Sequence, residues 1–279
     1  MSKYLELFLG EVGDLTEKTK LENKPYVAYS TKLGKVTYTV VPAKDPVVEG
    51  PADNEIWYTT TDGNVANFNI PSPESGYPGA IYTILSNEYV NGRGVIACKE
   101  KITIMPGEVY LLTSHFGETA GKLISSITLP ECCQEFEMAA CAGLMSLNSI
   151  NIPNGTTKIG DYAFCDCYSL TSIAIPNSVT SVGDWAFSGC EGLTSATIGN
   201  SVTSIGEHAF IGCSGLTSIT IPNSVTTIGR SAFAHCSSLT SITYEGTTEQ
   251  WNTITKGEDW NFNTPATHVQ CTDGQVPLQ

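Results

Sequence analysis

The chain has 279 residues and a formal net charge of −14, and only 15% of its residues are charged. Between Ser126 and Glu245 nine acidic residues face two basic ones, Lys158 and Arg230, a balance of −7. Because nucleic-acid binding needs lysine and arginine to neutralise phosphates, this composition excludes a nucleic-acid partner. No window approaches the ~20 apolar residues that cross a bilayer, so we expect no membrane span.

The N-terminal 54 residues predict a small β unit and a linker. The stretch KPYVAYSTKLGKVTYTVVP predicts a hairpin that turns at Lys32 to Lys35. We interpret residues 1–44 as either a separate hairpin module or an extension of the following cap, and residues 45–54, rich in proline and acid, as a linker. The first 20 residues hold only a short apolar patch, interrupted by Glu6, and make a poor signal peptide.

Residues 55–125 predict a β-rich N-terminal cap. The stretch RGVIACKEKITIMP supplies strands that could seed a sheet, and ITIMPGEVYLL predicts a degenerate first repeat.

Residues 126–245 repeat with a period of 23, and the unit reads I-P-N-S-V-T-x-I-G-x-x-A-F-x-x-C-x-x-L-T-S-I-x. In a degraded upstream unit, Cys141 stands in the Phe position and Leu144 in the Cys position, an exchange that a core selected for volume tolerates. The two most regular apolar columns are Phe164, Phe187, Phe210 and Phe233, and Cys167, Cys190, Cys213 and Cys236.

Each part of the unit has a local structural meaning. The stretch LTSIAI alternates between apolar and small polar residues, which predicts a short strand, and Pro176–Asn177 ends it with a turn. The stretch DWAFSGC places Ala186, Phe187 and Cys190 on one face of a helical or 3₁₀ turn. A unit this short buries its apolar face only by stacking on its neighbours. We therefore predict an α/β-type, right-handed leucine-rich-repeat solenoid with a parallel β-sheet on one side and short helical or 3₁₀ turns.

Residues 246–279 predict a C-terminal cap. We expect its lid to consist of Trp251, Ile254, Trp260 and Val269, with Cys271 beside them, because a stack of repeats leaves an open end that must be covered.

The unit IPNSVTSVGDWAFSGCEGLTSAT resembles the BspA-like, Treponema pallidum-type leucine-rich repeats of bacterial surface proteins. The tail from Ile242 resembles the segment that closes such arrays, and NEIWYTTTDG with SNEYVNGRGVI resembles the segment that precedes them. The resemblance implies a surface or secreted binding or adhesion protein that is not an enzyme. It implies a protein or glycan ligand and no cofactor.

The cysteine column favours buried thiols over chemistry. Free cysteine is among the most buried residue types, and disulfides between stacked coils would strain the sheet. Zinc requires convergent ligands at short spacing, which the sequence does not offer, so we expect no metal site. A disulfide stays open for the remaining cysteines outside the column, Cys98, Cys132, Cys133, Cys165 and Cys271.

Three acids recur at one repeat position, Asp161, Asp184 and Glu207, where strand spacing would set their carboxylates roughly 5 Å apart. That separation suits a retaining glycosidase or a calcium site, whereas an acid after the glycine also fits a helix N-terminus, and we favour this structural role.

The next position carries an aromatic row, Tyr162, Trp185 and His208, which we expect outside the core. It is either a platform for a sugar ring or protein partner or a cover for the coil edges. We therefore predict a binding protein that uses these acids and rings. One alternative is a structural or assembly module anchored through residues 1–44, and another is a carbohydrate-active enzyme that uses the acids.

Overall fold

The computed structural model describes residues 25–30, 34–39, 50–52, 55–63, 84–90, 93–98, 102, 104–105 and 123–278. The chain divides into two compact units, Met1–Glu49 and Gly50–Gln279. In the first unit, β1 (Pro25–Ser30) pairs antiparallel with β2 (Gly34–Thr39), and the pair nearest the turn is Ser30 with Gly34. The other residues of the predicted 1–44 module lie outside the described ones.

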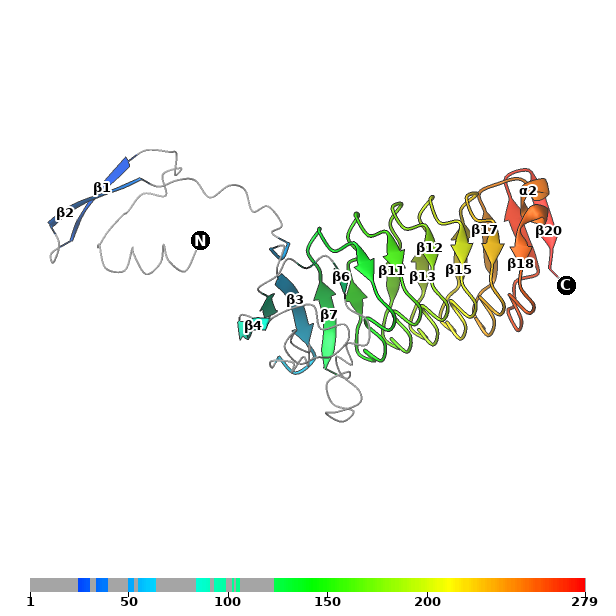
Figure 1. Ribbon diagram of the computed structural model, residues 1–279, viewed down its shortest axis with the longest axis horizontal. Coiled ribbons are helices and arrows are strands. Elements are labelled where there is room, and N and C mark those ends of the chain that lie inside the picture. Colours follow the sequence, from blue (N-terminus) through cyan, green and yellow to red (C-terminus); the bar gives the residue numbers. More distant parts are fainter. Residues whose placement is uncertain are drawn as a thin grey trace. The chain divides into compact units, whose positions relative to one another are not determined.

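The second unit is a solenoid whose coils stack one on the next (Figure 1). The leucine-rich strands lie side by side in parallel, and equivalent residues pair at the 23-residue interval, as Ser195 does with Ser218. These strands are β9 (Ser149–Ile150), β11 (Ser172–Ala174), β13 (Ser195–Thr197), β15 (Ser218–Ile221) and β17 (Ser241–Tyr244). In β15 isoleucine faces inward and serine or threonine outward, and in β11 and β13 the middle residue, Ile173 or Ala196, faces inward.

A second parallel sheet of seven strands runs along another side of the coil. We expected one sheet, and the V-T-x-I segment forms this second one with two-residue strands. Such strands show no alternating run, and their hydrogen bonds go only to neighbouring coils, so no local pattern reveals them. They are β6 (Ile104–Met105), β8 (Glu135–Phe136), β10 (Lys158–Ile159), β12 (Ser181–Val182), β14 (Ser204–Ile205), β16 (Thr227–Ile228) and β18 (Thr255–Lys256).

The remaining side of each coil, the turn side, is a chain of hydrogen-bonded turns. Backbone N–H groups there donate alternately to the next coil and to the third preceding residue: Trp185 donates to Glu207 at 2.8 Å, and Ala186 donates to Gly183 at 3.4 Å. Trp185 has a φ of +59°. This left-handed residue prevents the segment from continuing as a helix, although its i→i−3 bonds are of the predicted 3₁₀ type.

The core is built from the repeat columns, and the predicted solenoid of stacked 23-residue repeats is confirmed. The rings of Phe164, Phe187, Phe210 and Phe233 stack at 5.1–5.3 Å with nearly parallel planes. Where Cys141 leaves the Phe column short of volume, Phe136 supplies a ring 5.2 Å from Phe164.

Both ends of the solenoid are capped. At the N-terminal end, β3 (Glu55–Thr60) pairs antiparallel with β5 (Arg93–Cys98) and with β7 (Ile124–Thr128), and β5 in turn pairs with β4 (Ile84–Val90). The strand β7 pairs in parallel with β9, so the five-stranded sheet of the cap includes the first of the leucine-rich strands.

At the C-terminal end, α2 (Thr248–Thr253) begins at a capping box formed by Thr247 and Gln250. The antiparallel pair β19 (His268–Cys271) and β20 (Gly274–Pro277) ends the leucine-rich sheet. The residues expected to form the lid are all buried: Trp251, Ile254, Trp260, Val269 and Cys271.

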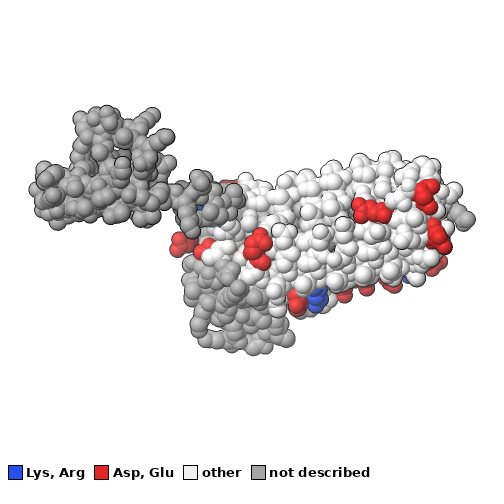
Figure 2. All heavy atoms as spheres, turned by 90° about the horizontal axis from the view of Figure 1, so that it is seen from above, with Lys and Arg blue, Asp and Glu red and all other residues white. Residues whose placement is uncertain are grey.

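The repeat region carries few charges on its surface. Figure 2 shows one face on which charged side chains are sparse and mostly acidic, in keeping with the nine acids and two bases of residues 126–245. A highly charged ligand therefore finds little to pair with on this face.

We predict that Gly183→Ala destabilises the solenoid by about 1–3 kcal/mol, the usual effect of overpacking. A Cβ at Gly183 would lie 2.5 Å from the carbonyl carbon of Gly160 and 2.6 Å from the amide nitrogen of Asp161, both backbone atoms of the preceding coil. Chemical denaturation measures the loss. Gly155→Ala is the control, since its nearest neighbour would be 3.5 Å away, and equal stability of the two variants would contradict the prediction.

Candidate functional site

The aromatic row, Tyr162, Trp185 and His208, lies on the turn side of three consecutive coils. The rings of Tyr162 and Trp185 are 5.9 Å apart with an interplanar angle of 4°. Those of Trp185 and His208 are 4.0 Å apart at 13°. The three side chains predicted to form a ladder therefore form one continuous stack.

The row is partly open to solvent. Tyr162 is 40% exposed, while Trp185 and His208 are half-buried. All three residues have a positive φ, from +56° to +59°. Ala139 and Ser231, at the equivalent position of other coils, also have a positive φ. The left-handed backbone thus belongs to the repeat and does not mark a strained site special to the row.

His208 ends the row with an unusual feature. Its Nδ1 atom is buried and makes no hydrogen bond, the one such side-chain atom among the residues that the structure describes. Burying an unpaired polar atom costs about 1–3 kcal/mol, so the close stacking on Trp185 is maintained against this cost.

The acidic residues beside the row bond to the backbone of the next coil. Asp161 Oδ1 accepts a hydrogen bond from the N–H of Asp184 at 2.8 Å, and Asp184 Oδ1 accepts one from the N–H of Glu207 at 2.7 Å. We expected helix N-terminal amides as the partners. No helix is present on the described turn side, and the amides belong to the following coil instead. One oxygen of each aspartate is therefore committed to holding coils together.

The cysteine column is fully buried, and each thiol donates to a backbone carbonyl of the preceding coil. Cys190 Sγ lies 3.2 Å from the carbonyl oxygen of Phe164, and Cys213 Sγ lies 3.1 Å from that of Phe187. Burial raises the pKa of the Cys213 thiol well above its ordinary value, so the group stays protonated and is a poor nucleophile.

Outside the column, Cys165 and Cys271 are free thiols. The thiol of Cys132 lies 3.2 Å from the carbonyl oxygen of Ile102, and that of Cys133 lies 3.8 Å from the carbonyl oxygen of Glu135. The side chain of Cys98 lies outside the described part. No cluster of three His, Cys, Asp or Glu side chains suited to a metal ion occurs among the described residues. Over the same residues, no helix has the length and hydrophobicity needed to cross a membrane.

The C-terminal cap holds a pocket of about 670 Å³ that the sequence did not reveal. Its walls include Trp251, Trp260 and Phe262 together with Asp259 and Asn261. The 23-residue alignment is lost at α2, where Thr227 pairs with Thr255 across a 28-residue interval. An Asn-rich stretch between aromatics, DWNFN, was the available signal.

Comparison with known proteins identifies the repeats. Residues 134–255 match the BspA-type leucine-rich repeat region in six copies. No curated protein matches the chain.

Three solved structures resemble parts of the chain. A leucine-rich cell surface protein from Faecalibacterium prausnitzii is 41% identical, with a TM-score of 0.39, over 40% of this chain and 30% of its own. The leucine-rich repeat protein of Treponema pallidum is 28% identical, with a TM-score of 0.40, over 48% of this chain and 55% of its own. A leucine-rich repeat protein from Eubacterium ventriosum is 21% identical, with a TM-score of 0.40, over 62% of this chain and 48% of its own. The chain thus spans roughly a third to a half of the length of these proteins.

We predict that alkylating reagents discriminate between the described thiols. Burial and the neighbouring Asp166 carboxylate raise the pKa of half-buried Cys165 to about 11. Its alkylation by iodoacetamide should therefore be slow at neutral pH and accelerate as the pH rises toward that value, because only the thiolate reacts.

The column thiols Cys190 and Cys213 should react only after unfolding. Peptide mapping by mass spectrometry, with and without denaturant, measures each site. Native-state modification of Cys190 as fast as that of Cys165 would show that the column is accessible.

Proposed function

Residues 134–255 are a BspA-type leucine-rich repeat region, and from this premise we propose that the chain is a non-enzymatic binding protein of a bacterial surface that uses the aromatic row to hold a partner. The observation that supports the proposal is the single stack of Tyr162, Trp185 and His208, partly open to solvent, on the turn side of three coils.

The row has the properties of an interface anchor. Tyrosine and tryptophan are enriched among the residues that dominate binding energies. The coil spacing holds the rings in place before any ligand arrives, so binding loses little conformational entropy at these side chains. The exposed residues of the leucine-rich sheet, by contrast, are small, for example Ser195, Thr197, Ser218 and Thr220, and they provide no such anchor.

The proposed partner is a protein, with a glycan as the second possibility for the same row. The Faecalibacterium prausnitzii protein is described as a cell surface protein. The resemblance of the repeats to those of bacterial surface proteins supports the same location for this chain, and adhesion is the role that we propose there.

We propose no catalytic role for the acids beside the row. A retaining glycosidase needs one carboxylate free to attack and a second free to carry a proton. Asp161 and Asp184 each use an oxygen to bond the next coil, an arrangement that supports a structural role.

We predict that the double variant Tyr162→Ala, Trp185→Ala loses capture of a partner while the fold survives. An array of host matrix proteins and glycans, probed with the full chain, identifies the partner first. Surface plasmon resonance then measures the variant, whose affinity should fall at least about tenfold.

Tyr168→Ala is the matched control. Tyr168 is 39% exposed, almost the same as Tyr162, but does not belong to the row. Circular dichroism establishes that each variant is folded. Undiminished binding by the folded double variant would refute the role of the row.

A further inference from the structure

The C-terminal pocket arises because the last coil has polar residues at two positions that are apolar core positions in the coils before it. The N–H of Phe210 donates to the carbonyl of Ala232, and the N–H of Phe233 donates in the same way to Trp260, both at 2.7 Å. Trp260 therefore occupies the alanine position of the final coil. The positions that hold phenylalanine and cysteine in the coils before it hold Asn261 and Thr264.

The aromatic wall of the pocket closes the core. Trp260 covers the end of the phenylalanine stack with its ring at 88° to that of Phe233, and Trp251 lies 5.7 Å from Trp260. Phe262 is 56% exposed at the rim. Phe262 therefore offers apolar surface to a ligand, whereas Trp251 and Trp260 are buried and form the floor of the pocket.

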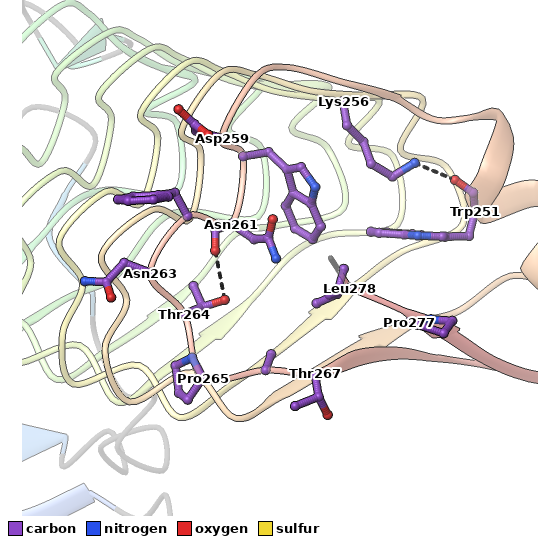
Figure 3. Close-up of a pocket in the computed structure, with 13 residues that line it drawn as sticks. Trp251, Lys256, Asp259, Asn261, Asn263, Thr264, Pro265, Thr267, Pro277 and Leu278 are labelled. Atoms are coloured by element: carbon purple, nitrogen blue, oxygen red, sulfur yellow. Dashed lines mark hydrogen bonds between the residues drawn. The ribbon is translucent and has the colours of Figure 1, made fainter.

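The polar groups of the pocket face the same space. Figure 3 shows Lys256 and Trp251 on one side, Asn263 and Thr264 on the other, and Asn261 between them. Lys256 Nζ donates to the carbonyls of Trp251 at 2.8 Å and Ile254 at 3.0 Å. The third N–H of the ammonium group is then available to a ligand.

Two polar side chains of the pocket are uncommitted. Within the described part of the chain, neither the carboxylate of Asp259 nor the amide of Asn261 has a hydrogen-bond partner. Donors and acceptors are therefore both available beside the aromatic rings.

From this arrangement we propose that the C-terminal pocket binds a neutral saccharide. A sugar ring has apolar C–H faces that pack on an exposed aromatic ring such as that of Phe262, and vicinal hydroxyls that bond amide and carboxylate groups. The pocket volume of about 670 Å³ falls within the ~300–1,000 Å³ of small-molecule sites.

Other ligand classes fit the pocket less well. The charges of Lys256 and Asp259 cancel, and the chain as a whole is acidic, so an anion gains little. A purely apolar ligand would bury Asp259 and Asn261 unpaired, at about 1–3 kcal/mol for each group. A cap needs a polar outer face but no concave pocket lined with aromatic rings, so capping alone does not account for the arrangement.

The test uses the ¹⁵N-labelled full chain and a panel of methyl glycosides of glucose, galactose, mannose, fucose and N-acetylglucosamine at millimolar concentration. We expect at least one glycoside to shift the indole N–H resonances of Trp251 and Trp260 while that of Trp185 stays in place. Absence of any such shift across the panel would overturn the proposal, and a shift confined to Trp185 would assign the sugar to the aromatic row instead.

Asn261→Leu is the decisive variant. It removes the amide at nearly constant volume in a former core column, so thermal unfolding should be unchanged or occur at higher temperature, while glycoside affinity falls about tenfold. Asn252→Leu, on the exposed face of α2 outside the pocket, should bind like the parent protein. A glycoside affinity of Asn261→Leu equal to that of the parent protein would overturn the proposal. The double variant of the aromatic row should leave glycoside binding intact, so the two proposals succeed or fail separately.

Discussion

Backbone hydrogen bonds between neighbouring coils set the spacing of every side chain in the repeat region, because they run along both parallel sheets and along the turn side as well. The phenylalanine rings stack at 5.1–5.3 Å because this spacing allows nothing else. It also leaves no room for a Cβ at Gly183 and Gly206. The threonine hydroxyls obey the same constraint: Thr194 Oγ1 donates to the carbonyl of Thr171, one coil back.

The same constraint separates structural chemistry from chemistry available to a ligand. Side chains whose polar atoms bond a neighbouring coil are occupied, as the Cys190 thiol and the Asp184 carboxylate are. What remains available lies where the pattern of the repeat is varied: in the aromatic row, where the residue changes from coil to coil, and in the last coil, where Asn261 interrupts a core column. The two proposed sites are of these two kinds.

The sequence predicted the columns well and the inter-coil contacts poorly. Alternation in LTSIAI gave the correct inward and outward faces, since Ile173 is buried and Ser172 exposed. The second sheet was missed because Ser181–Val182 becomes a strand only through its neighbours in other coils. The predicted partner of the Asp161 carboxylate, a helix N-terminal amide, was wrong for the same reason, because the actual partner is the N–H of Asp184 in the next coil. The pocket was not foreseen because the five extra residues before the last coil hide which column Asn261 continues.

Amide hydrogen exchange on the full chain tests most directly the claim that inter-coil bonds hold all sides of the solenoid. If it is correct, the N–H groups of Trp185 and His208, at the partly exposed turn side, exchange as slowly as that of Ile219 in the buried strand, because each donates to the next coil. Exchange of the turn-side amides at the rate of free loops, with protection confined to the sheets, would contradict the account.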